Sequence, residues 1–153
     1  MPLLGLTATA TVKVKEDIGK QLGISKDILH FQSSYNRPNL YYEIRHKKEI
    51  TDIEKDVLIM LRTRFKGMTG IIYCNSRKDC EKLSETLKRN CKINCAYYHA
   101  DLSFERRSEV QKGWMEDEIQ VIVATIAFGM GIDKRYVRFV IHYSLPKSLE
   151  SYA

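Results

Sequence analysis

The sequence predicts an α/β fold built on a parallel sheet. Short apolar runs at residues 71–74 and 121–124 have the length and residue types of buried strands. Stretches whose apolar residues recur every three or four positions stand between such runs, as in amphipathic helices. Because strands that alternate with helices usually pair in parallel, and 153 residues suffice for one core of ordinary size, we expect one compact domain.

The first third of the chain predicts one helix and two extended stretches. Apolar residues recur four apart from Thr11 to Leu22, and Gly23 suits the end of a helix. Residues 28–33 and 39–45 are expected to be extended, and the second stretch alternates apolar residues on one face. These two stretches could pair with each other or join one edge of the sheet.

The next elements are a helix and the first strand of the core. Helical spacing runs from Ile50 to about Arg64, and Thr51 followed by Glu54 resembles a capping box near its start. A glycine-containing turn then leads into the strand Ile71–Cys74.

Two further helices and strands follow. Ser76, with Asp79 three residues later, is suited to open a helix. A strand at Asn94–Tyr98, a helix around Val110 and the continuous apolar strand Val121–Ala124 come next. A strand that is apolar at every position is expected to be buried on both faces.

The last predicted strand is Val137–Tyr143. Pro146 follows it and fits the first turn of a further helix. The chain therefore alternates strands and helices up to its last residues.

Charge and cysteine usage restrict the class of protein. Lys and Arg number 25 against 19 Asp and Glu, so the formal net charge of +6 favours polyanionic partners. The opening residues lack a signal-peptide pattern, and no apolar run approaches the roughly 18 residues of a membrane span, so we expect a soluble intracellular protein. The four cysteines show no zinc-ligand spacing and are expected to be buried free thiols in a reducing compartment.

Three loops after predicted core strands are candidate ligand sites, because ligands gather at the carboxyl ends of parallel strands. They are residues 75–77, 99–101 and 125–134. Ser76 at a helix N-terminus, with Arg77 beside it, could hold a phosphate oxygen. The alternative is a simple helix cap with a solvated basic neighbour.

The loop 125–134 has the most unusual composition. Gly129 and Gly131 permit close backbone approach or positive φ, and Asp133 supplies a carboxylate. The third glycine of the dinucleotide fingerprint is missing, which argues against a nicotinamide cofactor. The alternative is an ordinary glycine turn between strands.

Other chemistry is disfavoured. His99, Asp101 and Ser103 are too close in sequence to assemble a hydrolase triad, and His99 is expected to be a polar loop residue that contacts a ligand or the next loop. No GxxxxGK[ST] loop occurs, so this chain alone cannot cradle a triphosphate in that way. The tyrosines could stack on bases but are more often half-buried in strands.

Six segments carry a resemblance to a known family. In chain order they are Gly5–Thr11 (GLTATAT), Asn36–Leu40 (NRPNL), Gly70–Lys78 (GIIYCNSRK), Tyr98–Leu102 (YHADL), Val123–Lys134 (VATIAFGMGIDK) and Val137–His142 (VRFVIH). In order and spacing they resemble the second motor lobe of RecQ-family ATP-dependent DNA helicases, nearer to eukaryotic, Bloom-like members than to bacterial ones. The resemblance implies a RecA-like lobe of the P-loop NTPase type, in which helices sandwich a parallel sheet.

The resemblance also implies a division of the chain and roles for single residues. Residues 1–22 would end the connection between the two lobes, and residues 23–153 would form the C-terminal lobe, truncated before the arginine-finger motif. The implied contacts to DNA are Arg37, Asn75, Ser76, Arg77, His99, Thr125, Phe128 and Met130. Gly131 and Asp133 would face the nucleotide, and no catalytic residue or metal ligand is implied within the chain.

Two residues or pairs depart from the family pattern. Asp101 stands where the family usually has glycine, and Arg135-Tyr136 stands where Pro-Asp is typical. Asp101 adds a negative charge beside the implied DNA path, and we expect Arg135 to offset part of it.

The implied function is DNA unwinding in the 3′ to 5′ direction, in repair, recombination or replication. ATP and Mg²⁺ would bind mainly to the first lobe, and zinc only outside this chain. The implied partners are single-stranded and partly duplex DNA and the first lobe, with a nuclear location in a eukaryote and a cytoplasmic one otherwise. This chain alone is expected to be inactive. The alternative is a non-catalytic module, derived from a helicase lobe, that binds DNA or protein.

Overall fold

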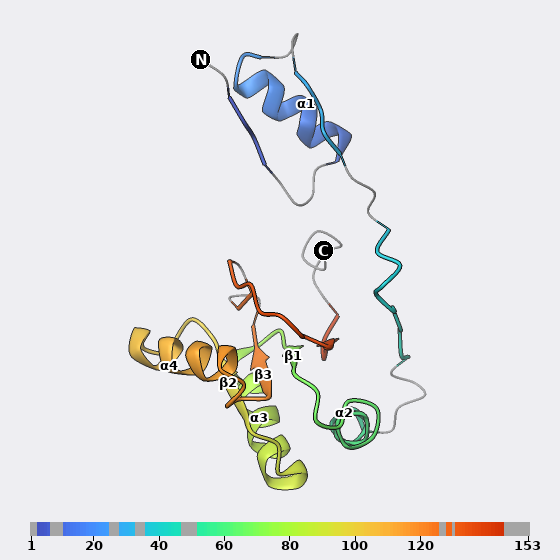
Figure 1. Cartoon of the computed structure of the whole chain (residues 1–153), viewed down its shortest axis with the longest axis vertical. Coiled ribbons are helices and arrows are strands. Elements are labelled where there is room, and N and C mark those ends of the chain that lie inside the picture. The colour runs from blue at the N-terminus through green and yellow to red at the C-terminus, as the bar shows by residue number, and fades with distance from the viewer. Residues whose placement is uncertain are drawn as a thin grey trace. The chain divides into compact units, whose positions relative to one another are not determined.

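A computed structural model describes residues 3–6, 11–24, 28–32, 36–46, 52–125, 128–129 and 131–145. The chain divides into two compact units, where the sequence predicted one (Figure 1). Residues Met1–Ile44 with Lys147–Ala153 form the smaller unit, and Arg45–Pro146 form the larger one. The physical reason lies in the core, since all the buried hydrophobic side chains among the described residues belong to the larger unit.

The smaller unit contains helix α1, Val12–Gln21. Thr11 caps its N-terminus by accepting a hydrogen bond from the Val14 amide at 3.3 Å. Gly23 adopts a φ of 67°, which is the left-handed conformation that commonly follows a helix. The predicted helix and its glycine terminus are therefore confirmed.

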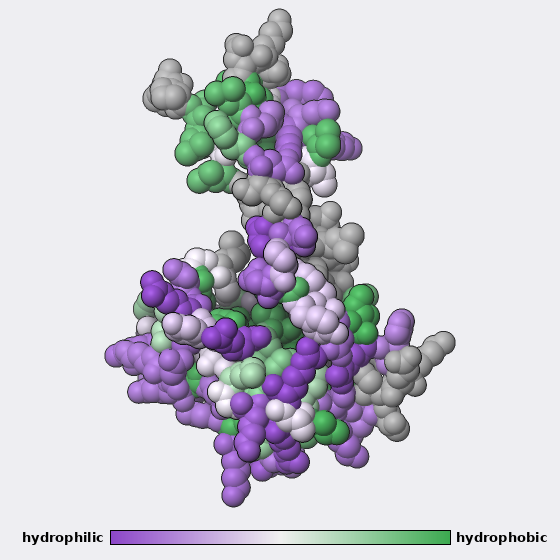
Figure 2. Space-filling view, turned by 45° about the vertical axis from the view of Figure 1, so that its right-hand side comes forward, coloured by the Kyte–Doolittle hydropathy of each residue, from purple (hydrophilic) through white to green (hydrophobic). Residues whose placement is uncertain are grey.

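The described residues 28–32 and 36–46 form no strand, so the stretches expected to be extended, 28–33 and 39–45, neither pair with each other nor join a sheet edge there. Leu29 is 83% exposed and Ile44 is 87% exposed. Figure 2 shows such apolar side chains as green areas. A strand needs a neighbour for its backbone hydrogen bonds, and the alternation of residues in sequence does not supply one.

The larger unit follows the predicted order of helices and strands. Its elements are α2 (Ile53–Arg62), β1 (Gly70–Tyr73), α3 (Arg77–Cys91), β2 (Cys95–Tyr98), α4 (Phe104–Met115), β3 (Val121–Ala124) and β4 (Phe139–His142). The four strands pair in parallel in the order β2-β3-β1-β4. The predicted parallel α/β sheet is confirmed, and the helix predicted from Pro146 lies outside the described residues.

Helices cover both faces of this sheet (Figure 1). On one face Val57 of α2, Leu83 of α3 and Val121 belong to one buried cluster. On the other face Trp114 of α4 and Ile122 belong to a second buried cluster. Because β3 contributes to both clusters, all four of its residues are buried, as the sequence predicted.

Two local details differ from the expectations or refine them. Asp52, rather than Thr51, caps α2, and its carboxylate accepts a hydrogen bond from the Lys55 amide at 3.2 Å. Thr51 lies outside the described residues. Glu54 forms an ion pair with Lys82 of α3 at 2.6 Å.

The cysteines are free thiols. Cys74, Cys80 and Cys95 are buried, whereas Cys91 is half-buried at the end of α3. Burial raises the pKa of the Cys95 thiol, which keeps it protonated and unreactive. Three of the four thiols therefore pack as small apolar side chains, as expected.

The described residues contain neither a membrane-spanning helix nor a cluster of metal ligands. None of the described helices combines the length and apolar character needed to cross a membrane. In the same residues, no cluster of three or more His, Cys, Asp or Glu side chains could hold a metal ion.

Candidate nucleic-acid interface

The three candidate loops begin at the same edge of the sheet. Backbone hydrogen bonds continue the pairing one residue beyond the strands: the Cys74 amide donates to Ala124 at 2.8 Å, and the Thr125 amide donates to Tyr98 at 3.2 Å. The loops after β1, β2 and β3 therefore start side by side. This is the edge at which parallel sheets gather ligands.

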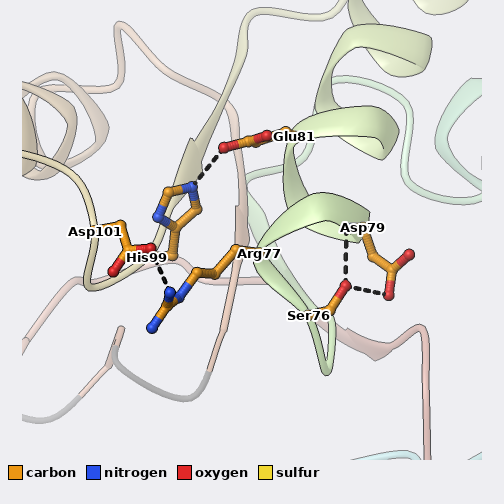
Figure 3. Close-up of polar contacts among 6 residues, drawn as sticks. All are labelled: Ser76, Arg77, Asp79, Glu81, His99 and Asp101. Atoms are coloured by element: carbon orange, nitrogen blue, oxygen red, sulfur yellow. Dashed lines mark hydrogen bonds and ion pairs between the residues drawn. The ribbon is translucent and has the colours of Figure 1, made fainter.

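Ser76 is the N-cap of α3. Its hydroxyl accepts a hydrogen bond from the Asp79 amide at 3.1 Å and donates to the Asp79 carboxylate at 2.7 Å (Figure 3). The cap interpretation of Ser76 is thus confirmed. A phosphate oxygen that used the Ser76 hydroxyl as a donor would have to replace the Asp79 carboxylate.

Arg77 begins α3 and forms an ion pair with Asp101, which lies on the loop after β2 (Figure 3). The sequence predicted Arg135 as the residue that offsets the charge of Asp101, and the structure instead pairs Asp101 with Arg77. The two side chains are 58% and 56% exposed, so solvent screens their attraction. The guanidinium remains at the surface and can exchange one anionic partner for another.

His99 is not an open loop residue. It is 3% exposed, and its Nε2 atom lies 3.1 Å from the Glu81 carboxylate of α3 (Figure 3). Its ring stacks on Tyr97 with centroids 5.5 Å apart. Nδ1 is buried and has no hydrogen-bond partner among the described residues. His99 therefore joins the end of β2 to α3, and this buried position leaves little surface for a ligand.

The site residues predicted in the loops after β1 and β3 lie in different surroundings from one another. The Asn75 amide donates to the Leu145 carbonyl at 3.2 Å, which links the end of β1 to the segment after β4. Thr125 is half-buried and its carbonyl accepts from the Phe128 amide at 3.1 Å. Phe128 is 2% exposed and its ring lies in the core, so any contact of this residue with a ligand would come from its backbone.

The glycine loop after Phe128 depends on its glycines. Gly129 has a φ of 119°, and a Cβ there would stand 2.7 Å from the Tyr73 hydroxyl. Gly131 has a φ of 71°. Both conformations are ones that L side chains rarely adopt, so the loop needs glycine at these two positions, as an ordinary glycine turn also would. Asp133 is exposed next to it.

Two predicted site residues remain. Arg37 belongs to the smaller of the two units. Met130 lies outside the described residues.

Burial changes the acidity of two side chains at this edge. Burial raises the pKa of the Tyr73 hydroxyl, which donates a hydrogen bond to the Phe128 carbonyl at 2.9 Å. Burial also lowers the pKa of His142, whose ring stacks on Tyr73 with centroids 5.4 Å apart. His142 is therefore held neutral, and neither residue offers a charge to a ligand at neutral pH.

Residues 52–153 match the family model described as the helicase conserved C-terminal domain. The chain belongs to this family. It is 49% identical over 152 residues to the ATP-dependent helicase SGS1 of Saccharomyces cerevisiae, a match that covers 99% of this chain and 10% of that protein. It is 52% identical over 151 residues to the ATP-dependent DNA helicase Q1 of Pongo abelii, covering 98% of this chain and 23% of the relative.

The lobe therefore resembles the C-terminal lobe of RecQ-type helicases at about half identity, as the six motifs predicted. The chain spans between a tenth and about a quarter of the length of these relatives.

Solved structures support the same fold. A DEAD box protein from Methanococcus jannaschii matches with a TM-score of 0.58 and 28% identity, over 65% of this chain and 27% of that chain. Domain 2 of the Mss116p DEAD-box helicase, bound to an RNA duplex, matches with a TM-score of 0.57 at 22% identity, over 65% of this chain and 40% of that chain. The second likeness concerns the fold alone. The RecA-like lobe that the motifs implied is confirmed.

Proposed function

We propose that this lobe is the second motor lobe of an ATP-dependent DNA helicase that moves along single-stranded DNA in the 3′ to 5′ direction. The observation that carries the proposal is Arg77, an exposed guanidinium at the first turn of α3, on the edge where three loops meet. The N-terminus of a helix attracts anions, and arginine binds a phosphate through two parallel hydrogen bonds. Asn75 and the backbone near Ser76 lie on the same loop.

The proposed roles of the remaining residues follow the family motifs. Arg37, His99, Thr125, Phe128 and Met130 are proposed to lie along the DNA path. Phe128 and His99 act from beneath this surface, because their side chains are buried. Gly131 and Asp133 are proposed to face ATP and Mg²⁺ bound mainly by the first lobe.

The exposed position of Asp133 fits this arrangement. A carboxylate there suits contact with a nucleotide held by the first lobe, rather than the cradling of a triphosphate. Differential contacts of this kind let ATP favour the closed state of two lobes.

The wider proposal concerns the intact protein. We propose that residues 1–22 end the connection between lobes and that residues 23–153 belong to the second lobe, so the lobe alone hydrolyses no ATP. The partners are the first lobe and single-stranded or partly duplex DNA. A nuclear protein of Bloom-like type, acting in repair, recombination or replication, is the proposed context, and any zinc site lies outside the chain.

Substitution of Arg77 by alanine in the intact protein tests the DNA contact. We expect weaker binding of single-stranded DNA, a shallower dependence of log affinity on log salt by about 0.7, and little change in ATP hydrolysis without DNA. The matched control is Arg89→Ala, which removes an exposed arginine of the same helix that pairs with Glu85. Unchanged DNA affinity in Arg77→Ala would remove the proposed contact.

ATP hydrolysis by the intact protein, with and without single-stranded DNA, tests the motor itself. Strong stimulation by DNA supports the motor lobe. DNA binding without hydrolysis would favour the non-catalytic module instead.

A further inference from the structure

The loop after β3 is held near both ends by one residue of α4. Trp114 is 1% exposed, and the Phe128 ring meets its edge with centroids 5.3 Å apart. Lys134 lies over the ring of the same tryptophan, with Nζ 5.2 Å from the ring centroid. Because Phe128 and Lys134 flank the glycines, a single side chain of α4 contacts both ends of the glycine loop.

The Lys134 ammonium occupies a site that suits a cation in three ways. Nζ contacts the Asp117 carboxylate at 2.6 Å and donates to the Met115 carbonyl at 3.2 Å. Met115 is the last residue of α4, so its carbonyl lies at the negative end of the helix dipole. The face of Trp114 supplies a cation–π contact.

This lysine is unusual because its side chain is only 4% exposed. A buried ammonium is costly unless it is paired and hydrogen-bonded. Within the described part of the chain, its ion pair, hydrogen bonds and cation–π contact come from α4 and the residues directly after it. Asp117 adopts a φ of 62°, a conformation rare for residues other than glycine, with its carboxylate on Lys134. The C-terminal end of α4 and Asp117 thus surround the ammonium with groups that attract a cation.

Phe128, at the other end of the loop, is also held by several contacts. The Phe128 carbonyl accepts from the Tyr73 hydroxyl at 2.9 Å, and the Phe128 ring meets Tyr98 with centroids 4.7 Å apart. Gly129 leaves room for the Tyr73 hydroxyl. Between these two anchors lie Gly131 and the exposed Asp133.

We propose that Lys134 is a positioning residue that binds the glycine loop to the C-terminal end of α4. Because Asp133 directly precedes Lys134, this contact also holds Asp133 in place. Asp133 is the residue proposed above to face the nucleotide, and in this respect the inference rests on the proposed function. The contacts of Lys134 with α4 do not depend on it.

Amide hydrogen exchange in the intact protein, without nucleotide or DNA, tests the clamp directly. Lys134→Met keeps the aliphatic stem and removes the charge. A hydrogen bond to a charged group contributes roughly tenfold or more to an equilibrium, so we expect exchange in peptides covering residues 129–135 to accelerate about tenfold. Lys134→Arg keeps a cation over Trp114 and donors toward Asp117, and should restore most of the protection.

A matched control is Lys112→Met, which removes an exposed lysine of the same last turn of α4, paired with Glu116 at 4.0 Å. Exchange of the loop in this control should equal that of the wild type. Asp117→Asn provides a second test variant in case Lys134→Met does not fold. Asp117 is 74% exposed, so the substitution should accelerate loop exchange by a few-fold without unfolding the lobe.

DNA-stimulated ATP turnover then tests positioning as distinct from stability. At a temperature where both proteins are folded, we expect Lys134→Met to lower turnover at saturating ATP about tenfold. Recovery of turnover in Lys134→Arg supports positioning. A loss of turnover that arginine does not recover would assign Lys134 a structural role only.

The two proposals fail in different ways. Loop exchange in Lys134→Met and Asp117→Asn equal to that of the wild type would overturn the clamp, even where DNA stimulates ATP hydrolysis normally. A wild-type protein without DNA-stimulated hydrolysis would overturn the motor function, whereas the exchange comparison would still decide the clamp.

Discussion

Asp101→Asn in the intact protein should strengthen binding to single-stranded DNA. The structure pairs Asp101 with Arg77, the arginine proposed to contact a phosphate. A phosphate that binds Arg77 must displace the Asp101 carboxylate or share the guanidinium with it. Asparagine keeps the shape of the side chain and removes the competing charge.

The size of the effect follows from exposure. The side chains are 58% and 56% exposed, and ion pairs in such positions contribute at most about 1 kcal/mol. Affinity should therefore rise by no more than about fivefold at moderate salt. One further uncompensated positive charge at the interface should also steepen the slope of log affinity against log salt by about 0.7.

Fluorescence anisotropy with a labelled oligonucleotide, measured over a series of salt concentrations, gives both quantities. Glu85→Gln is the matched control, because it removes an exposed carboxylate that pairs with Arg89 in the same helix, α3. The reasoning is refuted if Asp101→Asn changes neither affinity nor slope. It is also refuted if the gain persists in an Arg77→Ala background, since the effect would then come from net charge and not from the pair.

Three further predictions concern stability and reactivity of the folded lobe. Gly70→Ala places a Cβ on the ring of Phe139, and overpacking of this kind should destabilise the lobe by about 1–3 kcal/mol in chemical denaturation; an unchanged midpoint would contradict the packing. Burial lowers the pKa of His142, so the stability that its neutral form supplies is complete above about pH 6.5 and is lost as pH falls through the lower pKa of the folded state. His142→Gln should therefore reduce the difference between the denaturation midpoints at pH 7.5 and pH 5.5, and an unchanged difference would contradict this role of His142. Cys91, the half-buried thiol, should be alkylated faster than the three buried ones when peptides are quantified by mass spectrometry, and uniform rates would show that the burial does not protect them.

The sheet and its helices were predictable because they depend on local patterns. The apolar run Val121–Ala124 needs two covered faces, and the structure provides both. Ser76 and Asp79 formed the predicted cap because a serine hydroxyl and an amide three residues later meet by helix geometry alone.

The pairing suggested for the two extended stretches in the first third of the chain is not found among the described residues, because a strand requires a partner. Alternation at residues 39–45 states which side chains would share a face, but not whether a sheet edge is available. Conversely, the burial of the Phe128 ring could not be predicted from the sequence, because a glycine-rich loop is expected to lie at the surface.

The side-chain partners in the site were the least predictable feature. The sequence marks Asp101 as a departure from the family pattern, but its partner is Arg77, 24 positions earlier, and not the expected Arg135. His99 and Glu81 likewise meet only because α3 packs along β2. Such pairs depend on tertiary packing, and no spacing in the sequence encodes them.

These pairs have a common consequence for the proposed interface. Ser76 contacts the Asp79 carboxylate and Arg77 contacts the Asp101 carboxylate, so both groups closest to the start of α3 already have acidic partners (Figure 3). A DNA phosphate gains each contact only by replacing a carboxylate, which makes the net gain per contact small. A surface built in this way would bind a strand weakly and release it readily, as the proposed motor lobe would need in order to leave one phosphate before it binds the next.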